Sequence, residues 1–302
     1  MFISSSPQPQ NPDKYQSLVA TLHTRSATDY CSKICPPVNG LVCRQYTGED
    51  HIYAVISNPI TGEYVRTPEV TREAIHTSRE KTCFGYDPIE KQFKVMCMTW
   101  LSCDRSHEYQ VLTLGTGKLS WRKIQCCTPH DLHEDDGICI NGVLYYQAII
   151  DQKSSIVCFD VKSEKFSFVN IDHYLAAKIF RPLILINYKG SKLGIIHCDI
   201  YSNYFDLWVL ENAEEHNWSD HFYKMPEVMH PTRIKSVFSA GMIGSGEVVL
   251  YPIYSHNSLY ILYYNLEKNI ITSVSVEVPG LDYAVYHEVQ TFPNFVEDVK
   301  LM

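Results

Sequence analysis

Short runs rich in aromatic and β-branched residues follow one another along most of the 302 residues, and polar turns separate them. The chain contains 21 Tyr, 12 Phe and 4 Trp, and residues of this kind favour strands. Turns of one kind recur at a nearly constant step of about 50 residues, a spacing typical of propeller blades with four strands each. Together these observations predict an all-β fold, a kelch-like β-propeller of about five to six four-stranded blades.

Two patterns indicate the strands. Some runs alternate apolar and polar residues, as in Phe166–Phe168 and Val274–Val276, which is typical of strands with one buried face. Other runs are continuously apolar, which predicts strands buried on both faces: Tyr53–Ile56, Val95–Met98, Ile156–Phe159 and Leu259–Tyr264. Helix signals are weak, and only Pro68–Arg79 and His173–Lys178 could hold a turn or two.

The turns give the repeat its length. A polar turn precedes an aromatic or large apolar residue at five places, and the steps between these places are 55, 48, 52 and 52 residues, measured at Gly62, Gly117, Lys165, Asn217 and Asn269. A second turn falls earlier in each unit, at Gly40, Asp87–Gln92, Asn141-Gly142, Gly190 and Gly244–Gly246. Asn-Gly is a strong hairpin signal. An all-β sandwich or two stacked β domains is the alternative, but neither requires this longer period.

The net charge, the lengths of the apolar runs and the cysteine content indicate which classes of partner and which cell compartment to expect. The net charge is 26 − 34 = −8, and an acidic chain without long basic clusters repels a phosphate backbone, so no nucleic acid is expected. The apolar runs are too short to cross a bilayer and no signal peptide precedes them, so no membrane association is expected. The 11 cysteines, several inside apolar runs, fit a reducing compartment. We therefore expect an intracellular protein of the cytoplasm or nucleus.

Three clusters of side chains invite a chemical interpretation. Cys126–His133 carries closely spaced soft ligands, and Cys31 and Cys35 lie near His23, but neither spacing matches a standard zinc pattern. Adjacent residues on a strand point to opposite faces, so Cys126 and Cys127 are not expected to share a metal. The carboxylates of His133–Asp136 are expected in a solvated loop.

Other motifs of catalysis are missing from the sequence. It has no Gly-x-Ser-x-Gly elbow, no phosphate-binding glycine loop and no His-Glu-x-x-His. We expect no enzymatic activity, no catalytic residue, no metal site and no cofactor, and the residues that bind a substrate are not assigned. Trp121 and Trp218 each open an outer strand after a turn, and we expect them to pack between neighbouring blades.

Several segments, in a fixed order, resemble a known family. They span nearly the whole chain: Gly40–Cys43, Asn58–Tyr64, Cys83–Val95, Val111–Gly117, Gly137–Tyr146, Ile156–Asp160 and Val296–Lys300. This set is similar to the type 3 F-box-associated domain of plant F-box proteins. The resemblance implies a β-propeller that holds a target protein for ubiquitination, while an F-box docks the Skp-type adaptor of a cullin–RING (SCF-type) ligase.

The chain departs from that plan before Gly40, where no helical segment resembles an F-box. We expect residues 1–39 to be a remnant of the first blade and a linker, and residues 40–302 to be the propeller. With an incomplete first blade, the final segment Tyr286–Val299 is expected to lack partner strands. The resemblance thus implies a target-binding module, for which the Skp-type adaptor is a partner only if an F-box is present.

Two other functions stay open at this point. An enzyme on a propeller scaffold would need carboxylates, histidines or a metal converging on the central channel. A truncated remnant without activity is the other alternative. Neither the identity of the target protein nor the propeller face that binds it follows from the sequence.

Overall fold

The chain forms two compact units. One unit comprises Met1–Thr28, Ile186–Glu211 and Trp218–Asn294, and the other comprises Asp29–Leu185, Asn212–Asn217 and Phe295–Met302. The computed structural model describes residues 2–5, 17–19, 21–25, 31–71, 79–101, 106–132, 137–171, 184–199, 204–224, 237–243, 246–252, 254–255, 259–278, 287–288 and 291–292. All regular secondary structure in these ranges is β.

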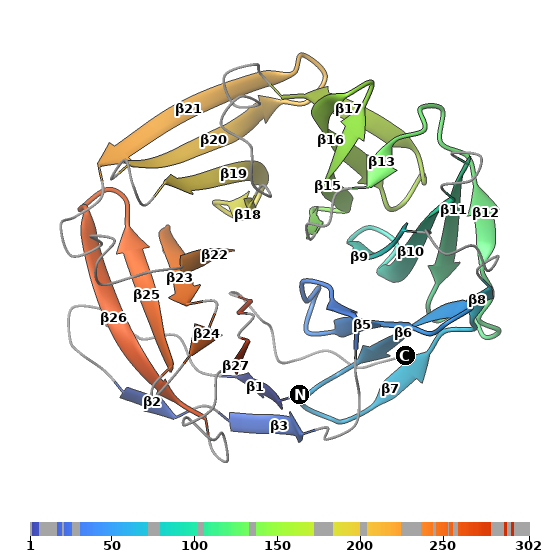
Figure 1. Ribbon diagram of the computed structural model, residues 1–302, viewed down its shortest axis with the longest axis horizontal. Helices are drawn as coiled ribbons and strands as arrows, with labels where there is room; N and C mark the ends of the chain where they lie inside the picture. The colour runs from blue at the N-terminus through green and yellow to red at the C-terminus, as the bar shows by residue number, and fades with distance from the viewer. Residues whose placement is uncertain are drawn as a thin grey trace. The chain divides into compact units, whose positions relative to one another are not determined.

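The unit around Asp29–Leu185 contains three antiparallel sheets that follow one another from blue to light green in Figure 1. The first sheet has the order β4 (Lys33–Ile34), β5 (Val42–Thr47), β6 (His51–Ser57), β7 (Tyr64–Arg66), with β8 (Val70–Thr71) also on β6. The second has β9 (Arg79–Asp87), β10 (Gln92–Leu101), β11 (Ser106–Thr113) and β12 (Arg122–Ile124) in sequence order. The third has β13 (Asp131–Leu132), β15 (Val143–Ile150), β16 (Lys153–Asp160) and β17 (Phe166–Asn170), with β14 (Ile138–Ile140) on β15.

Apolar layers join these three sheets. Cys43, Ala54 and Ile56 of the first sheet pack with Phe84, Phe93 and Val95 of the second. Between the second and third sheets lies a larger cluster: Cys83, Met96, Met98, Tyr109, Val111, Leu144, Tyr146, Ala148, Val157, Phe159 and Val161. The second and third sheets approach so closely that a Cβ on Gly85 would lie 2.8 Å from Val161 Cγ2. The central strands β10 and β16 are buried on both faces, as the runs at Val95–Met98 and Ile156–Phe159 predict.

The unit that contains Trp218–Asn294 holds two further four-stranded sheets and two short pairs. One sheet has the order β18 (Ile184–Tyr188), β19 (Lys192–Asp199), β20 (Tyr204–Asn212), β21 (Asn217–Lys224). The other runs β22 (Val237–Met242), β23 (Glu247–Pro252), β25 (Leu259–Asn265), β26 (Ile270–Glu277), and β2 (Ser17–Val19) adds to it in parallel with β26. The pairs are β1 (Phe2–Ser5) with β3 (Thr21–Arg25), and β24 (Tyr254–Ser255) with β27 (His287–Glu288).

The predicted turns fall between the predicted strands. Each turn of the ~50-residue series leads into the last strand of a four-stranded sheet, namely β7, β12, β17, β21 or β26. The earlier turn of each unit lies between the first two strands of the same sheet, as between β9 and β10. At Asn141 and Gly142 φ is +49° and +84°, the left-handed values that a two-residue hairpin turn requires. The repeat is thus one four-stranded antiparallel sheet, present five times in the described residues.

Some expectations fall partly outside the described residues. Val70–Thr71 form β8 and Arg79 begins β9, so no helical turn occupies the described part of Pro68–Arg79; His173–Lys178 lie outside the description. The expectation that the final segment lacks partner strands is wrong for His287–Glu288, which pair with β24, while residues 286, 289–290 and 293–302 lie outside the described residues. The division at residue 39 stays a prediction, and β4, before that residue, already pairs with β5.

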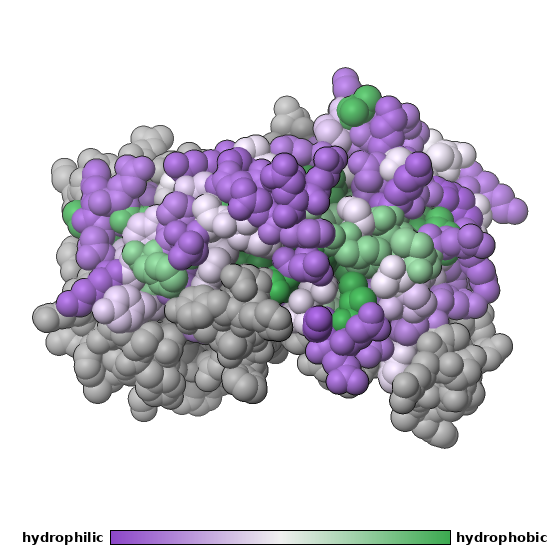
Figure 2. Space-filling model, turned by 90° about the horizontal axis from the view of Figure 1, so that it is seen from above, coloured by the Kyte–Doolittle hydropathy of each residue, from purple (hydrophilic) through white to green (hydrophobic). Residues whose placement is uncertain are grey.

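The described surface is mostly hydrophilic in the view of Figure 2, with smaller hydrophobic patches between the polar residues. Large hydrophobic side chains that are exposed include Ile60, Tyr64, Ile89, Ile149, Tyr204, Phe222 and Ile270. None of the described residues forms a helix long and apolar enough to cross a membrane.

Candidate functional site

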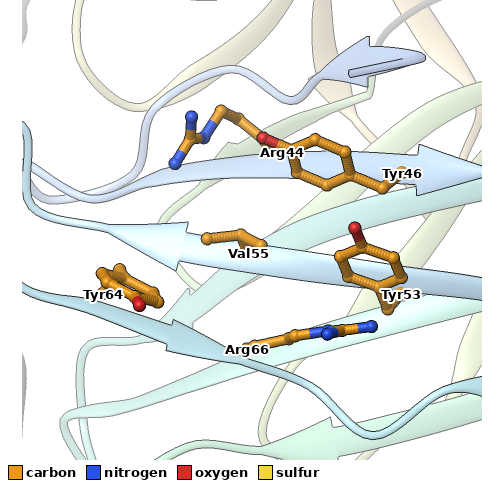
Figure 3. A pocket seen from close by; sticks show the side chains of 6 residues that line it. All are labelled: Arg44, Tyr46, Tyr53, Val55, Tyr64 and Arg66. Carbon is orange, nitrogen blue, oxygen red and sulfur yellow. The ribbon is translucent and has the colours of Figure 1, made fainter. Parts of the chain in front are cut away.

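A pocket opens on the first sheet of the Asp29–Leu185 unit, on the face opposite the apolar layer. Six side chains from β5, β6 and β7 line it: Arg44, Tyr46, Tyr53, Val55, Tyr64 and Arg66. Figure 3 shows Val55 on the middle strand, with Arg44 on one neighbouring strand and Arg66 on the other. We refer to these six residues as the arginine–tyrosine pocket.

The strand register explains why these six residues meet. Arg44 pairs with Val55, and Val55 pairs with Arg66, so the three side chains form a row across the sheet. Tyr46 pairs with Tyr53 one step further along, and every second residue of a strand points to the same face. The alternate residues Cys43, Ala54 and Ile56 point to the other face and into the core.

Ring contacts hold the pocket in shape. The Tyr46 and Tyr53 rings stack with centroids 5.1 Å apart and planes 7° from parallel. Arg66 Cζ lies 3.9 Å from the centroid of the Tyr53 ring, within the range of a cation–π contact. Arg66 Nη2 also donates to Glu69 Oε1 at 2.7 Å. These contacts order the Arg66 guanidinium before any ligand arrives.

The two ends of the pocket differ in exposure. Arg44 is only 9% exposed, whereas Tyr64 is 69% exposed and stands at the rim. Arg44 Cζ lies 5.9 Å from the Tyr46 ring centroid. Its Nε is buried and finds no hydrogen-bond partner among the described residues. The pocket is open to solvent and has a volume of about 280 Å³, just under the range of pockets for drug-sized ligands and large enough for one side chain.

The pocket is suited to binding an anion. Two guanidiniums supply forked N–H donors that match the oxygens of a carboxylate or phosphate. The tyrosine rings and Val55 add apolar walls, and aromatic side chains with arginine are the residues enriched at protein interfaces. The six lining residues therefore offer binding groups for a charged side chain.

The residues that the sequence singled out as soft ligands lie elsewhere, around His130. His130 is buried, and its Nδ1 lies 2.9 Å from the Thr128 carbonyl oxygen, so Nδ1 carries a proton and donates it. The Tyr146 hydroxyl lies 2.8 Å from Nε2 and donates to it. Both imidazole nitrogens are thus occupied, and burial lowers the pKa of His130.

The cysteines beside His130 are also engaged in other contacts. Cys126 donates to the Thr128 carbonyl oxygen at 3.2 Å, and burial raises the pKa of its thiol. Cys127 is exposed. In the part of the chain that the structure describes, no group of three or more His, Cys, Asp or Glu is placed to hold a metal ion. Residues 133–136 and the side chain of His23 lie outside that part, while Cys35 donates to the Thr82 carbonyl oxygen.

Of the two tryptophans, Trp121 joins two sheets as expected. It lies just before β12, packs against Ile52, Val70 and Cys97, and donates from Nε1 to the Pro68 carbonyl oxygen at 2.7 Å. Trp218 lies in β21 and is half-buried.

Comparison with protein families decides the assignment. A family model described as the F-box associated beta propeller domain matches residues 1–296. The chain belongs to this family of F-box-associated β-propellers. The five four-stranded sheets are therefore propeller blades, and the predicted fold is confirmed.

The sequence matches between this F-box-associated propeller and its relatives cover the whole chain. At1g53550 of Arabidopsis thaliana is 49% identical over 318 residues, a match covering 100% of this chain and 77% of the relative. F-box protein DOR of Arabidopsis thaliana is 39% identical over 318 residues, covering 100% of this chain and 78% of the relative. Among solved structures, the WD40 domain of SCAP from fission yeast matches with a TM-score of 0.42 and 9% identity, covering 81% of this chain and 75% of that one. A likeness at this level adds nothing to the assignment.

Sequence reasoning missed the arginine–tyrosine pocket. The signal was present as three spaced pairs, Arg44-x-Tyr46, Tyr53-x-Val55 and Tyr64-x-Arg66, each placing two side chains on one strand face. Only the strand register shows that the three pairs share the same face.

Proposed function

We propose that this F-box-associated propeller is a target-binding module without catalysis of its own, the substrate-recognition part of a receptor of the SCF type. The observation that carries the proposal is family membership across residues 1–296, together with relatives named as F-box proteins. The arginine–tyrosine pocket supports it, because its groups suit binding to a charged side chain.

The test is direct binding. The full 302-residue chain is expressed with a tag in plant cells, and proteins enriched over a tagged control propeller of unrelated sequence are identified. The most enriched protein is then produced pure and titrated against the pure chain by calorimetry. We expect saturable binding with one partner per chain. A folded chain with a sharp thermal melt that binds none of the enriched proteins would contradict the proposal.

Adaptor recruitment is a separate part of the proposal. The chain spans 77% and 78% of the lengths of the two relatives above. We propose that these 302 residues bind the target and that the Skp-type adaptor binds only when an F-box accompanies them. Co-purification of this chain with the adaptor, with full-length F-box protein DOR as positive control, is expected to recover adaptor with the control alone. Recovery with this chain would contradict this second part and leave target binding intact.

We also propose that the protein acts in the cytoplasm or nucleus. Cysteine chemistry supports this, because Cys97 and Cys158 carry free, buried thiols and burial raises the pKa of each to about 12. Such thiols stay protonated and behave as small apolar groups of the core. A fluorescent fusion of the chain is expected in the cytoplasm or nucleus, and accumulation in the secretory pathway would contradict this.

A further inference from the structure

We propose that the arginine–tyrosine pocket binds an anionic side chain, a carboxylate or a phosphate, on the protein that this module recognises. The inference rests on the proposed function and adds the chemistry of the ligand. Three observations carry it: a buried arginine whose Nε has no partner, a second arginine fixed in place, and a pocket of side-chain size.

Arg44 is the main evidence for an anionic ligand. A buried donor of a charged group is costly to leave without an acceptor. Arg44 is 9% exposed, and its Nε has no partner among the described residues. A bound carboxylate or phosphate would supply an acceptor for the guanidinium of Arg44, which lines the pocket. The cost of burying Arg44 would then be offset only in the complex, which favours binding.

Arg66 and the tyrosines make the site ready for its ligand. Arg66 is held by the Tyr53 ring at 3.9 Å and by Glu69 at 2.7 Å, and the Glu69 contact uses only Nη2 of the five N–H donors of a guanidinium. The side chain of Arg66 is 51% exposed, so its other donors can reach a ligand. Ordering a side chain before binding lowers the entropy cost of association.

The size of the pocket and the charge of the chain restrict which group of a partner can bind. A volume of about 280 Å³ suits one charged side chain. The chain as a whole carries a net charge of −8, so an acidic partner is repelled by most of its surface. An anionic residue held by the arginines that line the pocket would therefore fix where, and in which orientation, the target docks.

The test observes Arg44 itself. The Nε–Hε resonance of Arg44 is followed by NMR in the isotope-labelled full chain, and assigned by its loss in Arg44→Met. Four probes are used. Three are short peptides of Gly and Val that carry Glu, phosphoserine or Gln at the central position, and the fourth is inorganic phosphate. We expect a saturable shift with an anionic peptide and none with the Gln peptide.

Variants check that the binding occurs in the pocket. Arg44→Met is expected to lower the affinity for the anionic peptide about tenfold or more, which corresponds to a loss of about 1.4 kcal/mol or more in binding free energy. Tyr64→Ala changes an exposed rim residue, so it leaves folding intact and is expected to weaken binding severalfold. Lys123→Met is the control, because it removes one exposed positive charge of the same unit outside the pocket. Its affinity should equal that of the unchanged chain.

The outcomes are separable. A shift with the phosphoserine peptide alone identifies a phosphate, and a shift with the Glu peptide alone identifies a carboxylate; both support the proposal. No shift with any anionic probe, or an equal shift with the Gln peptide, overturns it. If a target protein binds the chain but Tyr64→Ala and Arg44→Met bind it equally well, the inference fails while the proposed function stands. If the anionic peptides bind but no target does, the proposed function fails alone.

Discussion

Replacing Glu164 by Ala should destabilise the Asp29–Leu185 unit through a buried lysine of the neighbouring blade. Lys94 on β10 lies with its side chain 8% exposed, and its Nζ contacts Glu164 Oε1 and the Val161 carbonyl oxygen, each at 2.7 Å. Glu164 also pairs with Arg122. Removing one partner of a buried pair costs about 3–5 kcal/mol, and since 14% of the Glu164 side chain is exposed we expect about 3 kcal/mol.

The size of the effect can be measured by urea unfolding and by thermal melting. A loss of about 3 kcal/mol lowers the Tm of a unit of this size by roughly 6–12 °C. Alanine is the appropriate substitution because Glu164 has φ of +58°, and both residues bear a Cβ in that strained conformation, so the backbone cost does not change. Glycine would relieve the strain and mask the loss.

The matched control is Glu211→Ala. Glu211 pairs with Lys192 at the surface, with both side chains more than a third exposed, so its loss should change stability little. The double variant Lys94→Met with Glu164→Ala should recover part of the loss, because no unpaired charge then stays buried. A Glu164→Ala protein as stable as Glu211→Ala would refute the reasoning.

Three further predictions concern other contacts between blades. Gly85→Ala should cost about 1–3 kcal/mol, measured by urea unfolding, because its new Cβ would meet Val161 at 2.8 Å; an unchanged midpoint would show that the sheets can separate freely. Trp121→Phe loses the hydrogen bond to the Pro68 carbonyl and part of the ring that packs against Ile52, Val70 and Cys97, so it should cost at least about 1 kcal/mol in the same assay. Burial lowers the pKa of His130 below 6.5, so the unfolded state binds the extra proton first and stability should fall as pH drops below 6.5, by at most about 1.4 kcal/mol per pH unit. In His130→Asn this part of the pH dependence should be absent, and an unchanged slope would assign it to other groups.

The sequence alone predicted the fold through its turns. Gly62, Gly117 and Asn141-Gly142 adopt the left-handed φ values that hairpin turns need. Because Gly and Asn adopt these values more readily than other residues, their positions in the sequence indicate the turns and therefore the repeat. Apolar runs such as Val95–Met98 then identified the strands buried on both faces. These signals are local, which is why they can be recognised without knowing what packs against what.

Contacts between blades could not be predicted in this way. Lys94 and Glu164 are 70 residues apart, and nothing near either residue announces the other. His130 is a different case, because it stands in a segment rich in residue types that bind metals, yet both of its ring nitrogens contact Thr128 and Tyr146. The packing of neighbouring sheets brings Lys94 to Glu164, and the pairing of β13 with β15 brings His130 to Tyr146. A short sequence segment contains neither.

The two faces of the first blade link folding to the proposed binding site. One strand register buries Cys43, Ala54 and Ile56 against the next blade and places Arg44, Val55 and Arg66 on the opposite face. A slip of one residue would exchange the two sets, putting guanidiniums into the core. The apolar face therefore maintains the geometry of the pocket without any residue being shared between them. Substitutions at the exposed Tyr64 and half-exposed Arg66 can consequently alter binding while the register, and with it the fold, is kept.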